Sequence, residues 1–431
     1  MSNRARIAFA LVAFHSSMWA AEPAQTLDQI KQRATRELAS LPNYVCIDSV
    51  ERTRRIPGER GFRTLDRIRV EQAHIDGTDR FSWIGSAAFL GKGQTPTGYG
   101  LNFKGDFADN RVLIFGNPWT TIRFSGEDRV EGRPALRFDY EVPVERGGLS
   151  AVINNVPGRI PTRGSFWADP VTAAVLRIDV EGRDIPEDLR LKSIVARTMY
   201  WQVLIGGRGV TLARNSEFVV TDSDGIVGRN QSIFSSCREY RVESTISFDS
   251  DAPAAGEPPS TAAPTRLPNG VELQLTLDTL VDSSKAAVGD VVLALVQEAS
   301  GGESLKGAKV YGRVARVIRF TDRLPAFGGK KKHPLARKPG LEWGQHLDEV
   351  LIGLEFSEVE FRRARMPFTG RLVAVEPTAG AGKRSNPVRS FGYYEDAAFV
   401  RYDPPGSASL YISDEDPVLR KGLVLRWITS R

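Results

Sequence analysis

Alternation of apolar and polar residues with a period of two constrains the fold of this chain more than any other feature. In the segment 66–70, Ile68 and Val70 alternate with arginines, and the segments 136–141 and 176–181 repeat the pattern. Turn-forming pairs lie near these segments at positions 76–77, 131–132 and 169–170, and further hairpins are indicated at 206–207 and 224–225. Alternation of this kind gives a sheet one apolar and one solvated face. It favours a large antiparallel sheet and argues against a doubly wound parallel fold.

Two short helices are expected next to the first strands. Thr26 and Gln29 form a capping-box pattern, and apolar residues then recur every three or four positions until Pro42 ends the run. Those apolar residues are Leu27, Ile30, Ala34 and Leu38. A second helix is predicted at 107–115, with its apolar contacts supplied by Val112, Leu113 and Phe115.

The segment 249–266, DSDAPAAGEPPSTAAPTR, is rich in proline and alanine and has no large apolar residue. This composition is typical of an extended linker. It predicts two domains, at 26–248 and 267–431. In the second, alternation resumes at 271–278, and the apolar run 291–296 suits a strand buried on both faces. A last strand is expected at 423–428, so this half is predicted to be an all-β barrel or sandwich.

The N-terminus has the layout of a secretory signal peptide at residues 1–21. Arg4 and Arg6 precede the apolar run 7–14, and small residues follow up to Ala20 and Ala21. The alternative is a buried N-terminal helix. The run is too short to span a bilayer, and no later stretch reaches such a length. We therefore expect an exported protein, periplasmic or associated with the cell envelope, without an integral membrane span.

Export makes the two cysteines informative. In an oxidising compartment Cys46 and Cys237 most simply form one disulfide. Because Cys46 lies in the first strand-like segment and Cys237 in one of the last before the linker, the bond is expected to tie together the two ends of one domain. The alternative is a pair of unrelated buried thiols.

The sequence contains few residues suited to catalysis. It has four histidines, and it lacks the HExxH, GxSxG, GxxxxGK[ST] and CxxC patterns. The acid pair Glu358 and Glu360 shares one strand face, where two carboxylates suit glycoside hydrolysis. Because so many acids alternate on solvent faces of this chain, solvated surface acids are the favoured interpretation. Convergence of His333 and His346 with an acid is the other route to an enzyme. We predict no catalytic residue, no cofactor and no metal site.

The formal net charge is +6, yet basic and acidic residues alternate along most segments, which argues against nucleic-acid binding. One dense basic cluster stands out between glycine and proline pairs. Its members are Lys330, Lys331, Lys332, His333, Arg337 and Lys338. Contact with an anionic surface, such as lipid headgroups or a cell-wall polymer, is one interpretation. A solvated loop is the other.

The segment 166–177, FWADPVTAAVLR, together with a leading helix, a long run of strands and an inserted helix, resembles the lipoprotein-localisation-factor superfamily of LolA/LolB-type carriers. This resemblance implies a half-open barrel over residues 26–248 whose concave apolar face holds acyl chains. The two cysteines and several longer loops depart from that family. Segments 267–273, 283–290 and 305–314 resemble a β-barrel module of exported bacterial proteins, distantly similar to the barrel of type IV secretion channels. That family is structural and implies no catalytic residues.

Three functions are consistent with these observations. The first is a non-enzymatic envelope protein that binds an acyl chain, a lipoprotein or another amphiphile. The second is a structural or assembly component of an envelope complex, and the third is a polysaccharide hydrolase. Trp83, Trp119, Trp167 and Trp201 fall in the first domain and either line a lipid cavity or belong to an ordinary core.

Overall fold

The computed structural model describes residues 23–430 except 87–88, 91–108, 144, 146–147, 154–155, 241–266, 301–304, 320–347, 362–363, 377–387, 391–404 and 415–416. The predicted signal peptide, the predicted linker and the basic cluster at 330–338 lie outside the described residues. Two large sheets account for most of the rest, and each has its own hydrophobic core.

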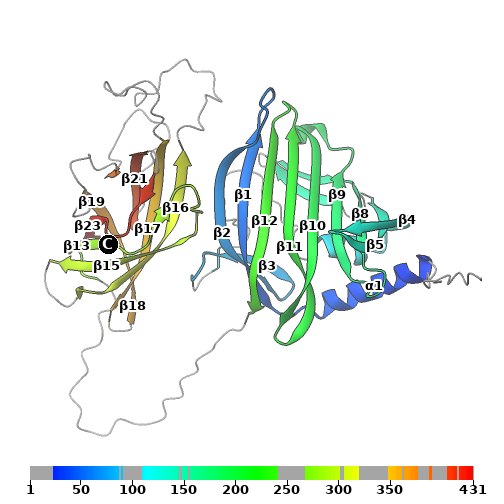
Figure 1. Cartoon of the computed structure of the whole chain (residues 1–431), viewed down its shortest axis with the longest axis horizontal. Helices are drawn as coiled ribbons and strands as arrows, with labels where there is room; N and C mark the ends of the chain where they lie inside the picture. The colour runs from blue at the N-terminus through cyan, green and yellow to red at the C-terminus, as the bar shows by residue number, and fades with distance from the viewer. Residues whose placement is uncertain are drawn as a thin grey trace, which may run out of the picture.

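The first sheet is antiparallel, with the strand order β3-β2-β1-β12-β11-β10-β9-β8-β5-β4. Its strands are β1 (Tyr44–Arg55), β2 (Arg63–Ile75), β3 (Thr78–Ser82), β4 (Thr121–Val130), β5 (Arg133–Val142), β8 (Thr162–Ala168), β9 (Val175–Gly182), β10 (Leu191–Ile205), β11 (Arg208–Asp222) and β12 (Val227–Glu239). The sheet curls into a half-barrel (Figure 1). A separate hairpin, β6 (Leu149–Ile153) and β7 (Val156–Ile160), follows β5, and a short 3-10 helix, η2 (Glu187–Leu189), precedes β10. The alternation predicted this antiparallel arrangement and its turns correctly.

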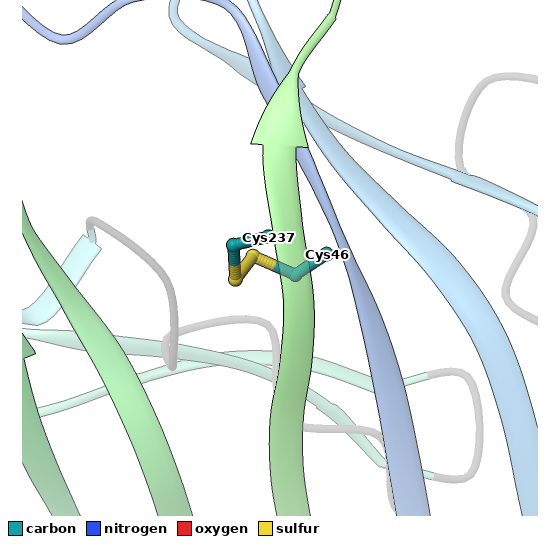
Figure 2. The surroundings of a disulfide bond; sticks show 2 residues. All are labelled: Cys46 and Cys237. Carbon is teal, nitrogen blue, oxygen red and sulfur yellow. A yellow bond between two sulfur atoms is a disulfide. The ribbon is translucent and has the colours of Figure 1, made fainter. Parts of the chain in front are cut away.

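The pairing of β1 with β12 joins strands that lie far apart in the sequence. Tyr44 is paired with Glu239 at one end and Arg55 with Val227 at the other. The predicted disulfide between Cys46 and Cys237 forms across this pair, with a sequence separation of 191 (Figure 2). It therefore fastens β1 to β12, the first and the last strand of this sheet in chain order.

Helix α1 (Pro23–Ala39) precedes the sheet, and α2 (Asp109–Phe115) is the predicted inserted helix. Helix α1 begins at Pro23, so Thr26 lies inside it instead of capping it, which corrects the predicted start. Proline suits the first helical position because its amide would have no partner there. In α2 the buried apolar residue is Ile114, and Leu113 and Phe115 pack against the core as expected. Val112 is exposed, contrary to the expected contact. Both helices pack their apolar residues on the concave face of the sheet, named here the inner face.

The second sheet runs in the order β19-β23-β13-β15-β16-β17-β21-β20, and β18 pairs with β17. Its strands are β13 (Glu272–Leu277), β15 (Val291–Ala299), β16 (Lys309–Arg319), β17 (Asp348–Phe361), β18 (Ala364–Pro367), β19 (Gly370–Glu376), β20 (Val388–Ser390), β21 (Ser407–Asp414) and β23 (Val424–Thr429). Strands β14 (Val281–Asp282) and β22 (Val418–Leu419) form a small extra pair. The amide of Gly406 donates to the carbonyl of Gly370 (2.7 Å), which brings the two ends of the sheet together.

The core of the second sheet contains three aromatic rings, Phe356, Phe368 and Trp427, in edge-to-face contact. Strand β15 differs from its prediction. Val292, Ala294 and Val296 are buried, but Val291 is half exposed. The apolar run therefore belongs to a strand with one buried face, because apolar residues also occupy solvent-facing positions in ordinary surfaces.

The second sheet contacts the first along the edge of β2. Strand β3 pairs only with residues 71–75 of β2. Val288 pairs with the part of β2 that precedes residue 71. The Val288 amide donates to the Arg67 carbonyl, and the Arg69 amide donates to the Val288 carbonyl, both at 2.8 Å. Arg69 also forms an ion pair with Asp290.

Gly289 makes this approach sterically feasible. Its φ is +100°, and a Cβ at this position would lie 2.1 Å from the Arg69 carbonyl oxygen and 2.9 Å from the Trp83 ring. The Arg313 guanidinium also packs on the Trp83 ring, 4.1 Å from the ring centre. The position thus requires glycine both for its conformation and for its close neighbours.

Breaking the disulfide is expected to destabilise the first sheet. The chain-entropy model gives a loop of this length a stabilisation of roughly 5 kcal/mol at most. A reductant should therefore lower the urea midpoint of the full-length protein, and the Cys46→Ala/Cys237→Ala variant should match the reduced protein. The reductant should not affect that variant. An unchanged midpoint on reduction would contradict the prediction.

Substitution of Gly289 by alanine is expected to open the contact between the sheets. The amides of Arg69 and Val288 should then lose protection from hydrogen exchange. Gly307→Ala is the matched control, since Gly307 has a φ of +79° and no atom within 4 Å of a Cβ. Retained protection of both amides in Gly289→Ala would show that the contact does not depend on this glycine.

Candidate functional site

A row of aromatic rings crosses the inner face of the first sheet. Phe124 on β4, Phe138 on β5 and Phe166 on β8 lie directly opposite one another in register. Neighbouring ring centres are 5.4 and 5.1 Å apart, and Phe115 of α2 packs edge-on against Phe166 at 5.1 Å. Phe138 and Phe166 are fully buried, while Phe124 is 42% exposed. This aromatic row therefore runs from the solvent-exposed edge of the sheet into its core.

The same line across the sheet becomes polar on the following strands. Phe166 is opposite Ile178 of β9, and the next partners in register are Thr198 of β10, Ser216 of β11 and Ser232 of β12. The last three, named here the polar row, are all buried. The inner face is thus apolar at one side and carries buried hydroxyl groups at the other.

Both helices cover this face and are tied together by charged side chains. Arg33 of α1 donates to Glu37 (2.8 Å) and to the carbonyl of Thr172 in the β8–β9 turn (2.6 Å). Glu37 in turn faces Arg111 of α2, with 3.8 Å between Oε2 and Nη1. The Arg111 guanidinium lies 5.4 Å from the centre of the Tyr200 ring. The apolar residues Ile30 of α1 and Ile114 of α2 are fully buried beneath them.

Tyr140 shows how closely the inner face is packed. Burial raises the pKa of its hydroxyl group, and nearby Tyr200 and Asp179 raise it further. The hydroxyl donates to the Asp179 carbonyl at 3.0 Å. Gly164 lies between them, because a Cβ there would be 1.9 Å from that carbonyl oxygen and 2.7 Å from the tyrosine hydroxyl. The described side chains of the inner face are therefore closely packed around Tyr140.

None of the four tryptophans belongs to the apolar core of the inner face among the described residues. Trp119 and Trp201 are 53% and 39% exposed, and Trp83 lies at the contact between the sheets. Trp167 packs against the Arg177 guanidinium on the outer face. Its Nε1 donates to Asp128 (2.8 Å), and this hydrogen bond lowers the pKa of Asp128.

Two grooves lie on the outer face. One, of about 490 Å³, extends across β2, β1, β12, β11 and β10 to Ala287, which precedes β15. Its apolar floor includes Ile233, which is 60% exposed, but Arg69 and Arg197 beside it already pair with Asp290 and Asp179. The other, of about 390 Å³, is lined by charged residues such as Arg163 and Glu181, which pair with each other at 2.9 Å. The charges of both grooves are thus largely neutralised internally.

The remaining candidates from the sequence do not form a site. Arg365 donates to Glu358 (3.1 Å) and lies 3.7 Å from Glu360, which also accepts from the Tyr311 hydroxyl (2.9 Å). These acids form a surface ion-pair network. His74 stacks on Tyr44 and contacts Asp79 at 2.8 Å.

The described ranges contain no cluster of side chains suited to a metal ion. They also contain no helix long and apolar enough to cross a membrane. His333, His346 and the cluster Lys330, Lys331, Lys332, Arg337 and Lys338 lie outside the described residues.

The turn in the segment 166–177 is held by Asp169. Its Oδ1 accepts from the amides of Val171 (3.0 Å) and Thr172 (2.8 Å), and its Oδ2 accepts from Arg133 (3.1 Å). Burial alone would raise the pKa of Asp169, but these hydrogen bonds outweigh it and hold the pKa below its ordinary value of 3.8. The turn positions β8 and β9, which carry Phe166 and Ile178 into the inner face.

No family model and no curated protein sequence matches the chain. Among solved structures it is similar to a DUF1329 family protein from Desulfovibrio piger, with 12% identity, a TM-score of 0.29 and coverage of 50% of this chain and 92% of the other. It is also similar to a putative outer membrane lipoprotein-sorting protein domain from Vibrio parahaemolyticus, with 11% identity, a TM-score of 0.27 and coverage of 49% and 91%. The resemblance of the C-terminal segments stays a prediction.

Protonation of Asp169 is expected to destabilise the first sheet in acid. Because its pKa is lower in the folded state, the unfolded chain binds more protons, so this stabilisation is present above pH 3.8 and is lost as the pH falls through the folded value. Urea unfolding between pH 6 and pH 3 measures the loss. Asp169→Asn keeps an acceptor oxygen without the charge and should show a smaller fall. An equal loss of stability in both proteins would show that protonation of Asp169 is not the cause.

Proposed function

We propose that this is a non-enzymatic, exported protein of the cell envelope that binds an acyl chain, from a lipid, a lipoprotein or another amphiphile, at the inner face of its half-barrel. The observation that carries the proposal is the aromatic row, which leads from the exposed Phe124 to the buried Phe138 and Phe166. An apolar path that begins at the surface and continues into the core offers an alkyl chain progressive removal from water. Each buried methylene contributes about 0.8 kcal/mol.

The two helices are the elements that an entering chain would displace. Ile30, Ile114 and Phe115 occupy the inner face that the chain would use. A chain that takes their place restores the buried apolar contacts, so helix movement and ligand binding are coupled through the same surface. The ion pairs of Arg33 and Glu37 at the edge of α1 are part-exposed and contribute little to holding the helix closed.

Export is supported by two features of the chain. Residues 1–21 have the layout of a signal peptide, and a disulfide is formed between Cys46 and Cys237, as is common outside the reducing cytosol. The cell envelope is therefore the proposed location.

A structural or assembly role is the second candidate, and the packed inner face favours it. A face already filled by Phe138, Phe166 and Tyr140 needs no ligand for stability. The hydrolase alternative has less support, because Glu358 and Glu360 are engaged by Arg365.

Binding of a neutral single-chain lipid tests the proposal. We expect native mass spectrometry of the full-length protein to detect a one-to-one complex with monopalmitoylglycerol. Phe124→Ser should weaken binding roughly tenfold, since removing one apolar ring from the path costs on the order of 1.5 kcal/mol.

Ile233→Ser is the matched control, because Ile233 is an exposed apolar residue on the outer face of the same sheet. Equal weakening by both variants, or by Ile233→Ser alone, would move the site to the outer groove. A protein that binds no lipid but forms complexes of fixed stoichiometry would favour the assembly role.

A further inference from the structure

Arg111 is a fully buried arginine whose hydrogen-bonding groups have no partner among the described residues. It is 0% exposed, and Nε, Nη1 and Nη2 all lack an acceptor within the described part of the chain. The charged group that faces it is Glu37, at 3.8 Å, which is beyond hydrogen-bond length. On its other side the guanidinium faces the ring of Tyr200.

The guanidinium of Arg111 therefore has hydrogen-bond donors that bind no acceptor among the described residues. Guanidinium stays charged in proteins and presents five N–H donors in a planar fork that matches a carboxylate or a phosphate. Burial of such a group without hydrogen bonds is costly. Glu37 offsets little of this cost, because its Oε1 accepts a hydrogen bond from Arg33. Thr198, two residues before Tyr200 and also fully buried, has a hydroxyl group without a partner among the described residues.

The position of Arg111 relates it to the aromatic row. Arg111 and Phe115 are four residues apart on α2, so they lie one helical turn apart on the same side of the helix. Phe115 contacts Phe166 of the aromatic row, whereas Arg111 faces Tyr200 on β10, the strand that also carries Thr198 of the polar row. One short helix thus places a cation above the polar side of the inner face and a ring above its apolar side.

We propose that Arg111 binds the oxyanion of an anionic single-chain amphiphile, a carboxylate or a phosphate, whose alkyl chain follows the aromatic row. The proposal rests on the proposed function and adds the class of headgroup. The anion takes the acceptor positions that Glu37 leaves unfilled, and Glu37, which is part-exposed, is the carboxylate that faces the guanidinium. Entry of the anion therefore displaces or competes with the Glu37 carboxylate.

A purely structural role is the competing explanation, in which Arg111 only fastens α2 to α1 through Glu37. The two explanations differ in one respect. A fastening role makes Arg111→Met and Glu37→Gln act alike on every ligand. A headgroup role makes them act in opposite directions, and only on anions.

The test compares three probes of equal chain length in the full-length protein: palmitate, hexadecyl phosphate and neutral monopalmitoylglycerol. For the preferred anion, Arg111→Met is expected to weaken binding roughly 10- to 100-fold, because a charge-assisted hydrogen bond is lost. Glu37→Gln should strengthen it several-fold by removing a competing negative charge. Arg111→Lys, which keeps the charge but not the fork, should fall between wild type and Arg111→Met.

Neutral monopalmitoylglycerol should bind all four proteins equally, and urea midpoints identify any variant that fails to fold. Loss of affinity for palmitate or for hexadecyl phosphate in Arg111→Met supports the proposal, and the anion that wild type prefers identifies the headgroup. Equal binding of both anions to wild type and Arg111→Met would overturn it and leave the proposed function intact. If Arg111→Met does not fold, an unchanged anion affinity in both Arg111→Lys and Glu37→Gln overturns it instead. Failure of all three probes to bind wild type would overturn the proposed function.

Discussion

The first sheet depends on the pairing of β1 with β12. Apart from β5 with β8, the other neighbouring strands of this sheet are consecutive in the chain, so their pairing closes short loops. The β1–β12 pair brings together residues separated by 191 positions at the disulfide, and the entropy of closing such a loop opposes it. The disulfide closes this loop in the unfolded chain as well, so folding no longer bears the entropy cost of closing it. Tyr44 of β1 and Phe234 of β12 join one buried core only when this pair forms.

Closure of the half-barrel gives the inner face one apolar side and one polar side. The strands β4, β5 and β8 contribute the aromatic row, and β10, β11 and β12 contribute the polar row. Helix α2 contacts both sides, because its Phe115 packs on Phe166 of the aromatic row and its buried Arg111 faces Tyr200 on β10, the strand that carries Thr198 of the polar row. An amphiphile has the same division between chain and headgroup. This correspondence is the physical basis for both proposals.

The second sheet protects an edge that the first sheet leaves open. Unpaired strand edges are templates for unwanted association, and the part of β2 before residue 71 has no partner in β3. Val288 supplies two backbone hydrogen bonds there, and Asp290 pairs with Arg69.

The sequence by itself determined the type of elements and which side of each strand is buried. Period two separates Ile68 from Arg67 whatever the strand's partner is, and export makes the Cys46–Cys237 bond the simplest pairing. Only the tertiary structure decided which strands are neighbours and in which register. Thr198, Ser216 and Ser232 look like ordinary strand residues until register aligns them with Phe124, Phe138 and Phe166. The burial of Arg111 and the contact of Val288 with β2 likewise depend on neighbours distant in sequence, which local periodicity does not encode.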